Sequence, residues 1–402
     1  MEKVFIVAAK RTPIGAFGGS LKNTSAGNLA AVAIKGALEA AKLNADKIDE
    51  VIVGNVVGAG QGMGVGRQAA LFAGIPDAVP AYGVNMVCGS GMKTVMDAVS
   101  HIRSGDAEIV VAAGVEVMSQ IPFAAPSSIR DGNKMGNLEL KDLLVADGLT
   151  DVYNQYHMGV TAENVAKEIG LTRQQQDEYA LSSQQKAVAA IEAGKFKDEI
   201  VPVEVKQRRE TVLFDTDEYP KANATMEALS KLRPAFDREG TVTAGNASGI
   251  NDGASAIIVA SESAVKAHGL TPIAEIVSYA QSGLDPKIMG LGPVESVNKA
   301  LEKAELTVND IDVYELNEAF AAQALGVIHQ LAETNQVPVN AIQDKANFNG
   351  GAIALGHPLG ASGNRILVTL VHELHKQNGQ YGVASLCVGG GMGTAVVIKA
   401  VK

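Results

Sequence analysis

Asn85-Met-Val-Cys-Gly-Ser-Gly-Met92 places one cysteine, Cys88, inside a short glycine-rich junction. The preceding residues 80–84 have extended character, and the residues that follow repeat apolar side chains at helical spacing. Cys88 is therefore predicted to lie where a strand or loop turns into a helix. Backbone N–H groups at a helix start favour negative charge, so this position should favour the thiolate. Gly89 and Gly91 would let a substrate approach the backbone closely. The alternative is a buried, inert cysteine in a turn.

The composition excludes several classes of protein. With 402 residues, of which 47% are hydrophobic, the chain should form two or three domains with a large core. A net charge of -10 argues against nucleic acid as a partner. No apolar stretch reaches the roughly 18 residues that a membrane span needs. The two cysteines, Cys88 and Cys387, cannot form a disulfide framework, which fits a reducing, cytoplasmic setting.

Predicted strands alternate with predicted helices in the first third of the chain. This order predicts a layered α/β fold, with strands at 4–9, 50–57 and 107–114 and helices at 28–41 and 61–73, and the buried-strand pattern returns at 253–260. The part between is more polar and contains scattered prolines, with helices expected at 161–169 and 173–193. We interpret it as an inserted loop domain, residues 120–248. The flanking domains are then residues 1–119 with 249–271, and residues 272–402.

An internal repeat relates the two ends of the chain. Residues 34–49 match residues 297–312 without a gap at seven positions, among them Leu38 with Leu301 and Ile48 with Ile311. Each copy follows a predicted strand, and each half later carries one cysteine in a glycine-rich turn. Two similar halves that face each other would bring both cysteines to one central site.

A second unusual stretch surrounds His357. Residues 347–363 are dense in glycine, which is costly unless the backbone takes unusual angles or approaches a ligand. Pro358 restricts the histidine before it to extended geometry. A rigidly held histidine with a pKa near neutrality could act as a base or a hydrogen-bond donor. In the alternative interpretation the glycines form a tight loop and His357 is structural.

Asn317 ends a predicted strand, where its amide could donate to a developing oxyanion, although asparagine is also a common N-cap. A cysteine, a histidine, an asparagine and a second cysteine are the parts needed for covalent acyl transfer from a thioester. Papain-like enzymes share the first three but have no role for the second cysteine. A zinc site formed by Cys88, Cys387 and His357 would lack a fourth ligand.

With these residues in place, the sequence resembles the thiolase family over essentially its full length, and within it the biosynthetic branch. The motifs that carry the resemblance are residues 11–15, 85–91, 114–119, 317–320, 350–360 and 387–393. The resemblance implies a thiolase fold, in which two similar α/β halves pack as five layers (α-β-α-β-α) with an inserted loop domain. It also implies an acyltransferase that reversibly condenses two acetyl-CoA to acetoacetyl-CoA and CoA by a ping-pong mechanism.

The resemblance further implies a role for each reactive residue. Cys88 would carry the acetyl group, and His357 would activate it and later hold the thioester oxygen of the second substrate. Asn317 would orient a water in the same oxyanion hole. Cys387 would remove the α-proton of the second acetyl-CoA and protonate the leaving CoA. The backbone N–H groups of Cys88 and Gly389 would form the other oxyanion hole.

CoA contacts are also implied, with CoA as substrate and product and with no cofactor or metal. These contacts are expected at Leu149, His157, Met158, Lys221, Phe236, Ala244, Ser248, Met289, Ala319 and Phe320. Met158 would narrow the acyl pocket. Lys221 stands where relatives often have arginine, and lysine cannot stack on adenine as a planar guanidinium does, so CoA binding is expected to be weaker or differently posed.

The family implies a homotetramer formed as a dimer of dimers, with residues 120–140 at the tetramer contact. Two other activities stay open on the sequence. One is a degradative 3-ketoacyl-CoA thiolase of broader chain length, which the segment around Met158 disfavours. The other is a non-catalytic acyl-CoA-binding protein with the thiolase fold, which the complete set of reactive residues disfavours.

Overall fold

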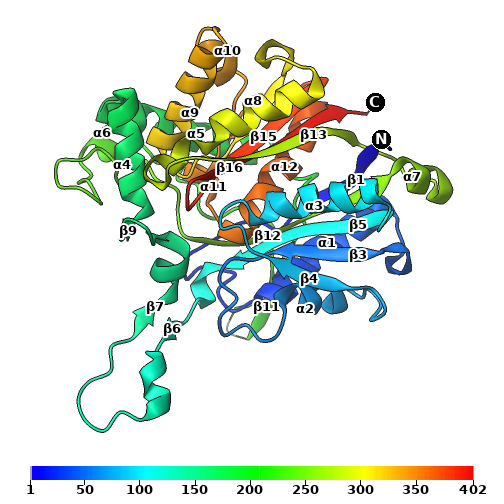
Figure 1. Cartoon of the computed structure of the whole chain (residues 1–402), viewed down its shortest axis with the longest axis horizontal. Coiled ribbons are helices and arrows are strands. Elements are labelled where there is room, and N and C mark those ends of the chain that lie inside the picture. The colour runs from blue at the N-terminus through cyan, green and yellow to red at the C-terminus, as the bar shows by residue number, and fades with distance from the viewer. Residues whose placement is uncertain (1, 208, 402) are drawn as a thin grey trace.

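A long mixed β-sheet runs through the molecule (Figure 1). The computed structural model describes residues 2–207 and 209–401. In that part the strand order is β14-β15-β16-β13-β1-β12-β5-β3-β4, and the short β2 (Gly15–Ala16) pairs with β12. The strands are β1 (Val4–Arg11), β3 (Glu50–Gly54), β4 (Ala81–Val84), β5 (Ile109–Val117), β12 (Asn251–Ser261), β13 (Ala274–Gly283), β14 (Val313–Leu316), β15 (Tyr381–Val388) and β16 (Met392–Ala400).

The sheet divides into an N-terminal and a C-terminal group of strands. β1 and β13 pair only at Phe5 and Ile6, whereas β12 pairs with β5 along almost its whole length. β5 is buried on both faces, as its sequence, apolar except for Glu116, favours. Its alternate residues enter different cores: Val111 packs with the outer helices, and Val110 packs with the central ones.

Helices fill three layers around the two groups of strands. α3 (Ser90–Ser104) and α12 (Leu359–Lys376) contact each other and strands of both groups, so they form the central layer. α1 (Ala26–Ala41) and α2 (Val65–Phe72) cover the N-terminal group, and α8 (Gly292–Ala304) with α9 (Ala321–Thr334) covers the C-terminal group. Each helix layer has its own buried apolar cluster. The predicted five-layer α/β fold is therefore confirmed.

The internal repeat folds into the same local unit in both halves. The C-cap of α1 is Lys42 and that of α8 is Glu305, and both have a left-handed backbone, with φ of 51° and 56° respectively. A short 3-10 turn follows in each half, Ala45–Lys47 and Val308–Asp310, and leads into β3 and β14 respectively. The matched sequence positions thus specify a helix, a cap, a turn and a strand.

The cysteines, however, do not occupy equivalent places in the two halves. Cys88 directly precedes α3, whereas Cys387 lies near the end of β15, before a hairpin to β16. The glycine-rich turns serve different geometries, because Gly390 and Gly391 take a positive φ of 88° and 85° in the hairpin. In chain order the helix equivalent to α3 is α12, which follows His357.

Two element boundaries differ from the sequence prediction. The helix expected at 61–73 begins only at α2, because Gly62 and Gly64 take positive φ values of 84° and 64°. The strand expected at 50–57 ends at Gly54, because the N–H groups of Val56 and Val57 donate to a carboxylate and not to a neighbouring strand.

Residues 120–248 lie mostly outside the layers. A hairpin of β6 (Phe123–Ala124) and β7 (Lys141–Asp142) carries a loop that extends away from the body (Figure 1). The helices predicted in this region are present as α4 (Met158–Ile169) and α5 (Arg173–Glu192). The remaining helices and strands are β8 (Thr150–Asp151), β9 (Tyr156–His157), β10 (Val203–Gln207), β11 (Glu210–Phe214), α6 (Met226–Ser230), α7 (Glu262–His268), α10 (Asn340–Gln343) and α11 (Ala352–Leu355).

Candidate active site

The two central helices meet at their N-terminal ends. An added Cβ at Gly114 would lie 2.3 Å from the carbonyl oxygen of Gly360, and one at Gly91 would lie 2.8 Å from the same atom. Such contact between backbones leaves no room for a side chain, so glycine is required. Cys88 lies two residues before the first residue of α3, and His357 lies two residues before that of α12. The crossing of the helices therefore places both residues at one end of the central layer.

The turn that presents Cys88 is strained. Val87 has a φ of 46°, which is an outlier for a β-branched residue and costs about 1–2 kcal/mol. Side chains hold the turn: Asn85 Oδ1 accepts from the N–H of Val87 at 2.9 Å, and Ser90 Oγ donates to the carbonyl of Val87 at 2.6 Å. Cys88 itself is partly buried. Backbone strain that is fixed on both sides in this way is typical of functional sites.

The turn after Cys387 packs directly on the Cys88 loop. An added Cβ at Gly89 would lie 2.9 Å from a methyl carbon of Val388. The backbone N–H groups of Gly389 and of Cys88 both point at the Cys88 sulfur. These are the two N–H groups predicted to form an oxyanion hole, and the structure brings them together at the predicted nucleophile.

Neither thiol is ionised at neutral pH in the free protein. Burial raises the pKa of Cys88 to about 11, although the two N–H groups act in the opposite direction. Burial, followed by the neighbouring Cys88, raises the pKa of Cys387 well above its ordinary value. The expectation that the helix start would favour the thiolate is therefore wrong, because desolvation outweighs the N–H groups. Cys88 needs a base.

His357 is held as a neutral base. Ser362 Oγ donates to the carbonyl of Pro358 at 2.9 Å, so it accepts from His357 Nδ1–H at 2.6 Å. The lone pair then lies on Nε2, which is buried and has no partner among the described residues. Burial, with the charge of Arg365, lowers the pKa of His357 to about 4. The backbone N–H of His357 donates to Asn251 Oδ1 at 3.1 Å, which fixes the loop.

Asn317 follows β14 and is 1% exposed. Its backbone N–H donates to the carbonyl of Ser385 at 3.0 Å, which holds it two residues from Cys387 along the adjacent strand. Both polar atoms of its side chain lack a partner within residues 2–207 and 209–401. A buried amide without partners is costly, so this one is suited to hold a water or a substrate oxygen.

Six of the predicted CoA contacts gather near Cys387. Met158, Met289, Ala319 and Phe320 share one buried apolar cluster with Cys387, and Phe236 packs against it. The ring of His157 stacks on Phe236 at 4.6 Å between centroids. Apolar side chains with one aromatic stack are suited to contact a small acyl group and part of a pantetheine chain.

The other predicted CoA contacts are more dispersed. Ser248 is joined to the cluster because its N–H donates to the carbonyl of Ala319 at 2.9 Å. Leu149 packs in a separate apolar cluster, which Cys88 also contacts. Lys221 is exposed and its ammonium lies 5.6 Å from the ring centre of Tyr219. Ala244 is exposed, in the loop that precedes Ser248.

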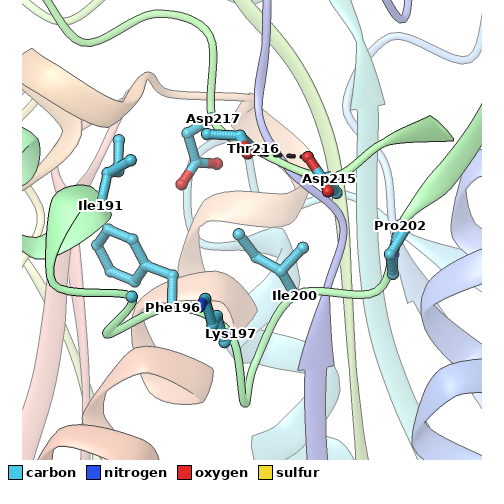
Figure 2. A pocket seen from close by; sticks show the side chains of 9 residues that line it. Ile191, Phe196, Lys197, Ile200, Pro202, Asp215, Thr216 and Asp217 are labelled. Atoms are coloured by element: carbon cyan, nitrogen blue, oxygen red, sulfur yellow. Dashed lines mark hydrogen bonds between the residues drawn. The ribbon is translucent and has the colours of Figure 1, made fainter. Parts of the chain in front are cut away.

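One pocket lies away from this site. Its volume is about 320 Å³. Phe196 and Ile200 line it and face the segment Asp215 to Asp217 (Figure 2). Its lining includes none of the predicted site residues. Arg11 lies 4.9 Å over the ring of Phe196 and pairs with the buried Asp217 at 2.7 Å, so this part of the pocket wall is a structural ion pair. Within the described part of the chain, no three His, Cys, Asp or Glu side chains are arranged to hold a metal.

Two residues that hold the site were not singled out from the sequence. Ser362 lies in the glycine-rich stretch, five residues after His357. Its hydroxyl reaches the histidine ring only because α12 begins between the two residues. Asn251 is a buried asparagine at the start of an apolar strand, which is the only signal that it carries.

None of the helices in the described residues is long and apolar enough to cross a membrane.

Family models for the thiolase N-terminal and C-terminal domains match residues 4–263 and 270–400. The chain belongs to the thiolase family. An acetyl-CoA acetyltransferase of Cupriavidus necator is 55% identical over 99% of this chain and 100% of its own. The crystal structure of the Bacillus anthracis acetyl-CoA acetyltransferase has a TM-score of 0.95 and 44% identity, over 100% of this chain and 99% of that one. That of human mitochondrial 3-ketoacyl-CoA thiolase in complex with CoA has a TM-score of 0.93 and 46% identity, over 100% and 98%.

The thiol pKa values of this thiolase predict how it reacts with iodoacetamide. Only the thiolate is alkylated, and the pKa of Cys88 is about 11, so the rate should rise about tenfold for each pH unit from about pH 7 to about pH 10. Mass spectrometry of the peptide that contains Cys88 measures the rate. A rate that levels off near pH 8 would show that the thiol is not desolvated in this way.

Proposed function

We propose that this thiolase is an acetyl-CoA C-acetyltransferase, which condenses two acetyl-CoA to acetoacetyl-CoA and CoA and also runs in reverse. The similarity to the Cupriavidus necator acetyl-CoA acetyltransferase supports this proposal. Two observations carry it. The two thiols lie close enough for Cys88 to raise the pKa of Cys387. Within the described residues, three buried polar atoms of the predicted site also have no hydrogen-bond partner: Nε2 of His357 and both amide atoms of Asn317. A Claisen condensation needs an acyl-enzyme and a stabilised enolate in one pocket, and these groups supply both.

In the first half-reaction, Nε2 of His357 takes the proton of the Cys88 thiol, and the sulfur attacks the thioester carbonyl of acetyl-CoA. The carbonyl oxygen becomes negative and is stabilised by the N–H groups of Cys88 and Gly389. The C–S bond to CoA then breaks, and the departing CoA thiolate takes a proton from Cys387. The products are acetyl-Cys88 and free CoA.

In the second half-reaction, the Cys387 thiolate removes a proton from the methyl group of a second acetyl-CoA. The resulting enolate oxygen accepts hydrogen bonds from His357, which now carries the proton from Cys88, and from a water held by Asn317. The enolate carbon forms a C–C bond to the acetyl group, and the C–S bond to Cys88 breaks. The histidine returns its proton to the Cys88 sulfur as acetoacetyl-CoA forms.

The test is thiolysis of acetoacetyl-CoA compared with 3-ketohexanoyl-CoA and 3-ketooctanoyl-CoA. We expect kcat/KM to fall at least about tenfold for each longer substrate, because Met158 is buried against Gly389 and closes the acyl pocket. Met158→Ala should raise the activity on the six-carbon substrate. Met96→Ala, which truncates a buried methionine of α3 in a different apolar cluster, is the matched control. Equal turnover of all three substrates would instead support the degradative activity, which the likeness to human mitochondrial 3-ketoacyl-CoA thiolase makes the second candidate.

We also propose that the protein is a homotetramer built as a dimer of dimers and that it acts in the cytoplasm without a cofactor. The hairpin loop of residues 120–140 carries Phe123 and Met135, which are 61% and 93% exposed. Large apolar side chains so exposed on a protruding loop indicate an interface.

Phe123→Ser combined with Met135→Ser should convert tetramers to dimers, as measured by light scattering coupled to size-exclusion chromatography. An unchanged mass would place the contact elsewhere.

A further inference from the structure

Glu116 is a fully buried carboxylate at the end of β5 that the reaction scheme does not use. Its Oε1 accepts from the side chain of Asn55 at 3.0 Å and from the N–H of Val57 at 3.1 Å. Its Oε2 accepts from the N–H of Val56 at 2.9 Å and from the N–H of Gly360 at 2.9 Å. One side chain thus binds segments that are about 300 residues apart in the sequence.

These segments lead to the two catalytic loops. Gly360 closes the base loop, residues 356–360, which carries the histidine. On the other side, the carbonyl of Val56 accepts from Asn85 Nδ2 at 3.1 Å, and Asn85 Oδ1 holds the strained Val87. Asn85 and Val87 belong to the nucleophile loop, residues 85–89. The carboxylate is therefore the shared anchor of both loops.

We propose that Glu116 is a positioning residue that sets the placement of the base loop relative to the nucleophile loop in the reaction proposed above. The packing supports this placement, because an added Cβ at Gly360 would lie 2.8 Å from Glu116 Oε2. A misplacement of reacting groups by about 1 Å can lower a rate about 100-fold.

The primary test is Glu116→Ala in acetoacetyl-CoA thiolysis by the full-length protein. We expect kcat to fall about 100-fold while KM stays within about twofold, because the hydrogen bonds of Glu116 go to none of the predicted CoA contacts. Glu116→Gln keeps one oxygen that can accept from the N–H groups of both Val56 and Gly360. Its kcat should therefore be at least about tenfold higher than that of Glu116→Ala. Iodoacetamide should alkylate Cys88 in Glu116→Ala at least as fast as in the wild type, because Asn85 and Ser90 still hold the turn at Val87 and a negative charge is removed.

Asp252→Ala is the matched control. Asp252 is also fully buried, on the strand beside β5, but its side chain accepts from the N–H and hydroxyl of Ser119 and, within the described residues, makes no hydrogen bond to either catalytic loop. It should lower the melting temperature as Glu116→Ala does and leave kcat within about threefold of the wild type.

Equal losses of kcat in Glu116→Ala and Asp252→Ala, or slower alkylation of Cys88 in Glu116→Ala, would overturn the positioning role of Glu116. If Glu116→Ala does not fold, Glu116→Asp carries the test, since it keeps the charge but shortens the reach: a kcat about tenfold lower supports the role, and an unchanged kcat overturns it. An inactive wild-type protein would instead refute the proposed function, so the two failures are distinguishable.

Discussion

Replacing Cys88 with alanine is expected to lower kcat for both condensation and thiolysis by about 10⁴-fold or more, because no acyl-enzyme can form. Incubation with acetyl-CoA labelled in the acetyl group measures the intermediate directly. The wild-type protein should retain label after gel filtration, and Cys88→Ala should retain none. The melting temperature should change by only a few degrees, because the side chain is partly buried and loses one sulfur atom.

Cys88→Ser is the matched variant for this experiment. It keeps a hydroxyl in the same strained turn, but a serine hydroxyl is a far weaker nucleophile at neutral pH and needs stronger activation than a thiol. We expect it to be nearly as inactive as the alanine variant. Full activity in Cys88→Ala would contradict the assignment of the nucleophile and the reaction scheme together.

Replacing Cys387 with alanine should separate the two half-reactions. The α-proton of the second acetyl-CoA then has no base, so we expect kcat for condensation to fall by about 10²–10⁴-fold, the range typical of general acid–base groups. Cys88 keeps its histidine and both N–H groups, so acetyl label should still accumulate on the protein, more slowly than in the wild type. Labelled protein that fails to turn over is the expected signature.

Ser385→Ala provides the control for Cys387. Ser385 is buried two residues earlier on β15, and its hydroxyl donates to the carbonyl of Thr394 at 2.7 Å. Its loss should lower stability by about 1 kcal/mol and leave kcat within a few-fold. If Cys387→Ala forms no acetyl-enzyme at all, the residue is needed for the pocket itself, and the role of α-proton acceptor is not supported.

The glycine-rich contexts of Cys88 and His357 indicate the chemistry from the sequence alone. Each of these residues precedes a helix in a glycine-rich segment, and such segments are readable because glycine is costly unless the backbone demands it. The repeat of residues 34–49 at 297–312 is readable for a similar reason, since helix, cap, turn and strand each depend on local residues. Periodicity located the buried strands because side chains alternate between the two faces of a strand.

The tertiary structure determined the properties of the site that depend on contacts between distant segments. The sequence predicted a thiolate at the helix start, but desolvation by residues from distant segments raises the pKa of Cys88. It likewise paired the two cysteines as equivalents, whereas the fold pairs α3 with α12 and so Cys88 with His357.

Glu116 is the clearest example of a residue whose role depends on contacts between distant segments. In the sequence it is one acidic residue in an apolar strand, and its meaning depends on Val56 and Gly360, which meet only when the two halves pack. The sequence alone therefore determined which residues react and which local elements carry them, because those signals lie within a few residues of each other. Their ionisation, mutual placement and shared anchor depend on contacts across hundreds of residues, and these exist only in the folded chain.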